Sequence, residues 1–258
     1  MTSSVHQVLE IARRSVVRTL RQPAQIIPNV TFPLLLLAIN SNGLRAATHI
    51  PGFPTNSFLD FFIPIAFMQG ALFASGTAGV DLARDIDNGF LNRLALTPMR
   101  SAALLLGQLG GAVALGTVQA AVYLAAGIAF GVRFKTGVAG ALTLFILAIL
   151  IALGFGGLGI FLALRTGSGE AVQSTFPLLF FLLFLSSMNL PRNLIEADWF
   201  RDVATANPVS YMIEAMRSLV ISGWDTQALL LGFSFAFALI ALALGLSAVS
   251  LKSRMVRT

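Results

Sequence analysis

The chain has 258 residues, of which 56% are hydrophobic and only 11% charged, and its formal net charge is +6. A soluble domain carries roughly 25% charged residues, so a chain this apolar has too little polar surface to cover a globular core. The charges lie between apolar runs of about 20 residues, the length that crosses bilayer hydrocarbon, which predicts an all-α integral membrane protein.

Residues 4–22 are predicted to form an amphipathic helix, with Arg14, Arg18 and Arg21 on one face. A basic amphipathic helix of this kind lies in the plane of the membrane interface, with its arginines toward anionic headgroups. The alternative is a hydrated helix packed on a soluble neighbour. We favour the interface because an apolar run follows at once. The opposite, apolar face holds Val5, Val8, Leu9, Ala12, Val16 and Leu20.

Six membrane spans are predicted from the apolar runs that follow. If the N-terminus is cytoplasmic, 11 of the 17 Lys and Arg residues lie on that side, so both termini are expected there. Apart from Asp60 at one edge, the spans contain no Asp, Glu, Lys, Arg or His. The expected spans are 24–41, 58–80, 102–131, 137–163, 171–190 and 226–249.

A charged loop, RDIDNGFLNRLALTPMRS at 84–101, joins the second and third spans. Residues 86–96 are predicted to form a short helix that ends at Thr97-Pro98, because the residue before a proline is disfavoured in the α region. The third span follows almost directly, so a push on this helix would reach it with little slack. A plain polar connector is the alternative. The apolar face holds Phe90, Leu91 and Leu94, and Asp85, Asp87, Asn88 and Arg93 are expected to stay hydrated.

The segment 189–225 differs in character from the spans around it. Pro191 and Pro208 break it into short helices. Its spaced aromatic residues are typical of chain that rests at the headgroup boundary, so we expect outer-face helices that dip partway into the outer leaflet. Glu214 and Arg217 stand three apart on a helix and are expected to pair, as a local brace rather than as a substrate contact.

Several chemistries are disfavoured by what the sequence lacks. There is no G-x-x-x-x-G-K-[ST] motif, so the chain does not hold nucleotide phosphates itself. It has no cysteine, and His6 and His49 lie far apart, so neither a metal site nor a catalytic cluster is predicted. A channel or an ATP-independent carrier would need charged groups inside the spans or filter-like loops. The basic residues are spread along the loops, so nucleic acid is not an expected partner.

The chain resembles the membrane permeases of type-2 ABC exporters, the family that contains the antibiotic-resistance drug exporters of actinobacteria. The resemblance covers the whole chain in length and in the number and order of spans, and it is sharpest in two motifs. The first, D-x-x-x-D-x-x-x-G-F-L-x-R-L-x-x-T-P-x-R from Asp81, is carried by Asp85, Asp87, Gly89, Phe90, Leu91, Arg93, Leu94, Thr97, Pro98 and Arg100. The second, N-P-x-x-Y-x-x-E-x-x-R, is carried by Asn207, Pro208, Tyr211, Glu214 and Arg217.

The resemblance implies a single transmembrane permease domain over 1–258, with an elbow helix at 4–22, a cytoplasmic coupling helix at 84–98 and extracellular re-entrant helices at 191–222. It implies that the coupling helix docks in a groove of a separate ABC ATPase subunit, which binds ATP and Mg, so this chain is a transporter subunit and not an enzyme. Phe90, Leu91 and Leu94 would then face the ATPase, with Arg93 and the acids at the rim.

The resemblance also places the translocation path of a permease dimer, homodimeric or heterodimeric, along spans one, two and five in the inner (plasma) membrane. The expected substrate is a hydrophobic or amphipathic drug-like compound, as in multidrug efflux and antibiotic resistance. A lipid or lipid-linked polysaccharide is the alternative. The candidate path residues are Asn29, Gln69, Gln173, Phe176 and Phe180.

Overall fold

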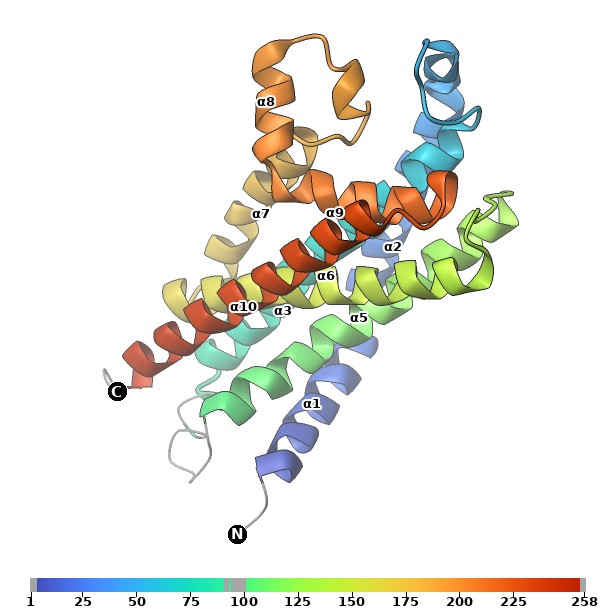
Figure 1. Cartoon of the computed structure of the whole chain (residues 1–258). Coiled ribbons are helices and arrows are strands. Elements are labelled where there is room, and N and C mark those ends of the chain that lie inside the picture. Colours follow the sequence, from blue (N-terminus) through green and yellow to red (C-terminus); the bar gives the residue numbers. More distant parts are fainter. Residues whose placement is uncertain (1–3, 91–92, 94–100, 256–258) are drawn as a thin grey trace.

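The computed structural model describes residues 4–90, 93 and 101–255, and in these ranges the chain is helical and contains no strand. The start of α1 and the end of α10 lie at one end of the helix bundle, and α8 lies at the other (Figure 1). The elements are α1 (Ser4–Leu20), α2 (Pro23–Gly43), η1 (Arg45–His49), α3 (Phe58–Asp87), α5 (Ser101–Ala129), α6 (Gly137–Thr166), α7 (Gly169–Phe184), η2 (Arg192–Leu194), α8 (Asp198–Ala206), α9 (Pro208–Arg217), η3 (Ser218–Ser222, a π-helical turn) and α10 (Thr226–Met255).

Five helices in the described part of the chain are long and apolar enough to cross a membrane: α2, α3, α5, α6 and α10. The helix expected at 171–190 is shorter than predicted, because α7 has only 16 residues and ends at Phe184. A helix of that length rises about 24 Å, less than the hydrocarbon thickness of about 30 Å. The chain continues past Phe184 as non-helical backbone that is largely buried.

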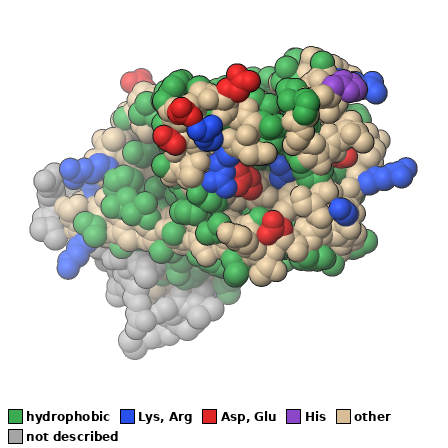
Figure 2. Space-filling view, turned by 45° about the horizontal axis from the view of Figure 1, so that its top comes forward, with side chains coloured by type: hydrophobic (Ala, Val, Ile, Leu, Met, Phe, Trp, Pro, Cys, Tyr) green, Lys and Arg blue, Asp and Glu red, His purple; other side chains and the backbone are tan. Residues whose placement is uncertain are grey.

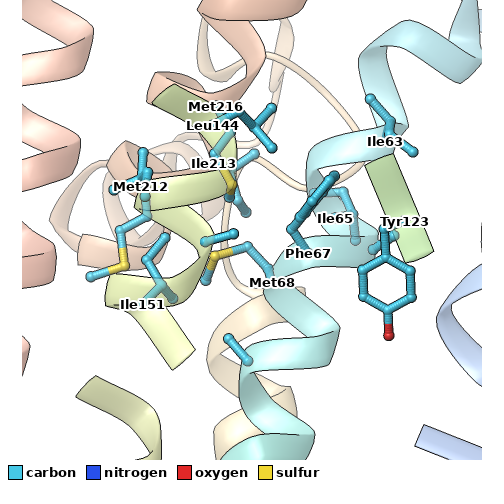
Figure 3. Close-up of a cluster of buried hydrophobic side chains, with 14 of the residues drawn as sticks. Ile63, Ile65, Phe67, Met68, Tyr123, Leu144, Ile151, Met212, Ile213 and Met216 are labelled. Atoms are coloured by element: carbon cyan, nitrogen blue, oxygen red, sulfur yellow. The ribbon is translucent and has the colours of Figure 1, made fainter. Parts of the chain in front are cut away.

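Helix α3 is the centre of the bundle and packs against α2, α5, α6, α7 and α9. In its most apolar window 83% of the residues are buried, against 11% in α2 and 17% in α10, whose apolar side chains face outward as lipid contacts would. Figure 3 shows the core where α3, α6 and α9 meet, with Met68, Ile151 and Met216 among its side chains.

Helices α3 and α6 approach each other closely in this core, and the approach depends on glycine. A Cβ on Gly159 would lie 2.0 Å from the carbonyl oxygen of Ser75, and one on Gly79 would lie 2.7 Å from the carbonyl oxygen of Gly159. Small residues let helix backbones approach in this way, which matters in lipid because helix association there depends on packing.

Helix α1 lies along α5 (Figure 1). Ile11 is buried against Gly107. The hydroxyl of Ser15 donates to the carbonyl of Gln108 and accepts from the N–H of Gly111, both at 3.1 Å. This contact fixes α1 to the start of α5.

The expected orientation of α1 is wrong for two of its arginines. Arg14 and Arg18 point toward acids of α3 rather than toward headgroups, because a carboxylate in a low-dielectric interior attracts them more strongly than water-exposed phosphates do. Arg21 is exposed, as expected. The exposed side of the helix is mixed, with the apolar Leu9, Val17 and Leu20 beside the polar His6, Glu10 and Arg13.

We predict that Gly159→Ala destabilises the protein, because the added methyl group would overlap a backbone carbonyl and force α6 away from α3. Overpacking of this kind costs about 1–3 kcal/mol. The matched control is Gly245→Ala in α10, where nothing lies within 4 Å of the added Cβ. Thermal unfolding in detergent should show a lower midpoint for the first variant only. Equal midpoints for the two variants would disprove the close α3–α6 contact.

Candidate functional site

A charge cluster joins α1, α3 and α5 at the end of the bundle where α3 stops. Asp85 is only 3% exposed, although the sequence predicted a hydrated side chain. Arg14 donates to both of its carboxylate oxygens at 2.8 and 2.9 Å, Arg18 donates at 2.6 Å, and Gln108 of α5 donates at 3.2 Å. One turn earlier, Asp81 accepts from Arg18 at 3.1 Å. We call these five residues the α1–α3 charge cluster.

The cluster holds α1 in place electrostatically. A guanidinium that binds both oxygens of a carboxylate makes the stronger, charge-assisted type of hydrogen bond. These bonds to Asp85 raise the pKa of Arg14, while burial acts in the opposite direction. Asp85 has a guanidinium on each of its oxygens and a third donor from Gln108, so its charge is compensated although water does not reach it.

The coupling segment begins with a helix break next to this cluster. The helix predicted at 86–96 is corrected at its start, because residues 86–87 belong to α3, which is capped by Asn88. Gly89 then adopts φ +66°, a conformation that residues with a Cβ rarely take. Phe90 and Arg93 are again helical, and the N–H of Arg93 bonds to the carbonyl of Gly89 at 3.1 Å.

The guanidinium of Arg14 lies 3.8 Å from the centre of the Phe90 ring. Arg14 therefore contacts both Asp85 of α3 and the first residue of the next helix. Asp87 and Arg93 are exposed, as expected. The remaining predicted members of the coupling segment, Leu91, Leu94, Thr97, Pro98 and Arg100, lie outside the described residues.

At the opposite end of the bundle, the second motif ties α9 to α7. Asn207 caps α9 by accepting from the N–H of Val209 at 3.0 Å, and Pro208 occupies the first turn, where its missing N–H is not needed. The amide nitrogen of Asn207 also donates to the carbonyls of Leu182 and Leu185 at 2.6 and 3.0 Å. These carbonyls are at the end of α7, so the cap residue of α9 supplies hydrogen-bond donors to carbonyls that have no helical partner beyond the end of α7.

The predicted pair between Glu214 and Arg217 is not formed. Glu214 instead accepts two hydrogen bonds from Arg192, at 2.6 and 2.8 Å. Arg192 also lies over the ring of Tyr211, whose hydroxyl donates to the carbonyl of Thr205 at 2.8 Å. Arg192 binds both carboxylate oxygens at once, while the guanidinium of Arg217 donates to backbone carbonyls instead.

Arg217 is 5% exposed and uses its guanidinium as a backbone clamp. It donates to the carbonyls of Phe61, Ser187 and Met188 at 3.1 to 3.2 Å, and so joins α9 to the start of α3 and to the chain after α7. Burial lowers the pKa of this guanidinium to about 9, with the nearby Glu214 acting to raise it. The buried group therefore stays charged at neutral pH.

A cavity of about 290 Å³ opens between α2, α3 and α7. It brings together three of the predicted path residues, Asn29, Gln173 and Phe176. Phe180 does not line it but packs against Phe176, with ring centres 4.8 Å apart and the ring planes tilted by 54°. Gln69 is buried elsewhere along α3 and does not reach the cavity. The other lining residues are Gln25, Phe73, Gly76, Thr77 and Val80.

Tyr123 of α5 was not predicted from the sequence to act in this region. Pro33 has no N–H, so the carbonyl of Asn29 loses its helical donor. The hydroxyl of Tyr123 donates to that carbonyl at 3.0 Å and Gln119 donates at 3.4 Å, both from α5. The proline itself was the available signal, since a span that contains one needs a donor from another helix.

Comparison with known proteins gives a consistent result. The family model described as "ABC-2 type transporter" matches residues 6–221. The chain is 24% identical to the "Probable doxorubicin resistance ABC transporter permease protein DrrC" of Mycobacterium tuberculosis, over 85% of this chain and 78% of that protein. It is 27% identical to the "Daunorubicin resistance ABC transporter permease protein DrrB1" of Streptomyces coeruleorubidus, over 81% of this chain and 74% of that one. The resemblance inferred from the two motifs is confirmed.

We predict that Asp85→Asn loosens α1, because it leaves two guanidiniums facing a neutral side chain. Since Arg14 is 38% exposed on its side chain, the loss should be about 2 kcal/mol, less than the roughly 3–5 of a fully buried pair. The chain has no cysteine, so Ser15→Cys provides a single buried thiol between α1 and α5.

Thiol labelling of that variant should become faster when Asp85→Asn is added. The matched control is Asp87→Asn, because Asp87 is exposed on the same helix. An unchanged labelling rate in the Asp85 variant would show that the cluster does not hold α1.

Proposed function

Because the chain belongs to the ABC-2 type transporter family, we propose that it is the permease subunit of an ATP-driven exporter. It is a multi-pass membrane protein and a transporter component rather than an enzyme. The main structural support is the helix break at Gly89, which directly follows the central helix α3 and precedes Phe90, whose ring contacts Arg14 of the α1–α3 charge cluster.

In this proposal a separate ATPase subunit binds ATP and Mg and holds the helix that begins at Phe90. Movement of the ATPase then enters the permease by two routes. One is covalent, through Asn88 and Gly89 into α3, which has 30 residues. The other is the contact of Arg14 with Phe90 and Asp85, which leads into α1. This arrangement supports an elbow role for α1 and a coupling role for the segment 84–98.

The chain is proposed to cross the membrane six times, with both termini on the ATPase side of the plasma membrane. Figure 1 supports this, because α7, although short, runs from the end of the bundle that holds the start of α1 toward the end that holds α8. The helices α8 and α9 would then be the re-entrant helices of the outer face. Their positions are set by the Asn207 and Arg217 contacts to the end of α7.

A second permease copy is proposed to pack against α2 and α7, so that the cavity becomes part of a path between two subunits. Both helices leave large apolar side chains uncovered on either side of the cavity. Lipid tails would cover such surfaces equally well, but lipid would not need the amide groups that face the cavity. The exposed apolar residues are Ile27, Phe32, Leu35 and Ile39 on α2, and Leu178, Phe181, Leu182 and Phe184 on α7.

The lining of the cavity supports a hydrophobic or amphipathic, drug-like substrate. The lining has no charged side chain, it has the aromatic rings of Phe73 and Phe176, and it has amide groups from Asn29 and Gln173. The side-chain oxygen of Gln25 is buried there without a hydrogen-bond partner, so it can accept from a hydroxyl or amine of the substrate. Two relatives whose names refer to doxorubicin and daunorubicin resistance support the same class.

We predict that replacing Phe90 and Leu94 together with Asp abolishes binding of the ATPase subunit and substrate-stimulated ATP hydrolysis. Two carboxylates in an apolar contact would remain unpaired and desolvated. Co-purification and hydrolysis rates measure the effect, and membrane fractionation checks that the spans still insert. The control is the double variant Leu9→Asp and Leu20→Asp, which puts two carboxylates at exposed apolar positions of α1. Full coupled hydrolysis by the variant of Phe90 and Leu94 would rule out docking through this helix.

We predict that Gln173→Leu weakens substrate stimulation of ATP hydrolysis about fivefold while basal hydrolysis stays unchanged, because it removes one polar contact worth about 1 kcal/mol. The effect is measured as the substrate concentration that gives half-maximal stimulation, once with a drug-like amphiphile and separately with a lipid. The control is Thr143→Val, because the hydroxyl of Thr143 bonds to a carbonyl of its own helix, α6, and Thr143 does not line the cavity. An equal effect of both variants would show that the cavity is not part of the substrate path.

A further inference from the structure

The outer face carries a second cavity, of about 500 Å³, that the proposed function does not use. It lies between η2, α8, α9 and the start of α10, and its lining includes Arg192, Arg201 and Arg217. Figure 2, with the top of the molecule turned forward, shows basic and acidic side chains gathered in a hollow of this face. We propose that this cavity binds the phosphate group of an anionic phospholipid.

The strongest reason is the unbalanced charge of Arg217. Its guanidinium is almost fully buried, and in the part of the chain that the structure describes it has neutral carbonyls and no carboxylate as acceptors. A guanidinium has five N–H donors, and the three carbonyls leave two of them for another acceptor. A buried cation is costly unless an anion is near, and the cavity is the open side of this one.

The other charges of the cavity do not supply that anion. Glu214 is taken by Arg192, which binds both of its oxygens. Asp225 caps α10 by accepting from the N–H of Ala228 at 3.0 Å. Arg201 is paired with Asp198 at the exposed edge. Among the three guanidiniums of the lining, that of Arg217 is therefore the one without a hydrogen-bonded carboxylate, and this favours an added anion next to it.

The surroundings favour a lipid phosphate over a free one. Trp199 and Trp224 are 67% and 56% exposed near the cavity, one on α8 and the other just before α10. Exposed tryptophans of membrane proteins concentrate at headgroup depth, so the arginines lie at the level of lipid phosphates. The cavity wall also includes the apolar Phe61 and Ile221, which can contact the start of an acyl chain.

The test is native mass spectrometry of the purified, delipidated full chain titrated with phosphatidylglycerol or with phosphatidylcholine. We expect one tightly bound phosphatidylglycerol per chain, held at least about tenfold more tightly than phosphatidylcholine. Arg201→Gln and Arg217→Gln should each reduce that preference about fivefold or more. The matched control is Arg133→Gln, an exposed arginine of the same outer face that does not line the cavity.

Two further measurements decide the source of the phosphate and guard against misfolding. Displacement of the lipid by millimolar inorganic phosphate would show that the phosphate alone is recognised and overturn the lipid assignment. Retention of the lipid supports it. If Arg217→Gln lowers the thermal midpoint, Arg201→Gln carries the test, because Arg201 makes only edge contacts. Equal binding of both lipids, or equal loss in the Arg133 control, would overturn the proposal.

Discussion

In hydrocarbon a backbone carbonyl cannot hydrogen-bond to water, so it needs a donor from the protein. Many polar side chains of this chain supply such donors. Pro33 frees the carbonyl of Asn29, and Tyr123 reaches across from α5 to satisfy it. At the end of α7, Asn207 and Arg217 donate to carbonyls that no helical N–H can reach. In each case a local break in a helix becomes a contact with another helix. The breaks therefore help to define the tertiary structure.

The same constraint decides what could be predicted from sequence. Length and hydropathy were enough to predict the helices α2, α3, α5, α6 and α10, because each is a continuous apolar run. The breaks at Pro191 and Pro208 also follow from the chain itself. The end of α7 does not, because residues 185–190, LSSMNL, contain no charge, proline or glycine that would mark the end of a helix. Side chains of α9 stabilise the early end, and hydropathy contains no information about them.

The charged residues show the limit more sharply. Spacing along a helix predicted that Glu214 would pair with Arg217, and Asp85 was predicted to be hydrated. Both predictions were wrong for the same reason. In a low-dielectric interior a carboxylate gains most from the donor with the best geometry, wherever that donor lies in the chain. Arg192 is 22 residues from Glu214, and Arg14 is 71 from Asp85. Pattern alone identifies the charged residues but not their partners.

Packing density indicates which helices can move around the cavity between α2, α3 and α7. The backbones of α3 and α6 touch at Gly79 and Gly159, so these two helices cannot slide past each other without separating. α2 is mostly uncovered, and both α2 and α7 contain a proline one turn beyond a cavity-lining residue, Pro33 after Asn29 and Pro177 after Gln173. Prolines are the usual sites of helix bending. A displacement that enters through α3 is therefore expected to move a rigid core, while the cavity changes shape by bending of α2 and α7.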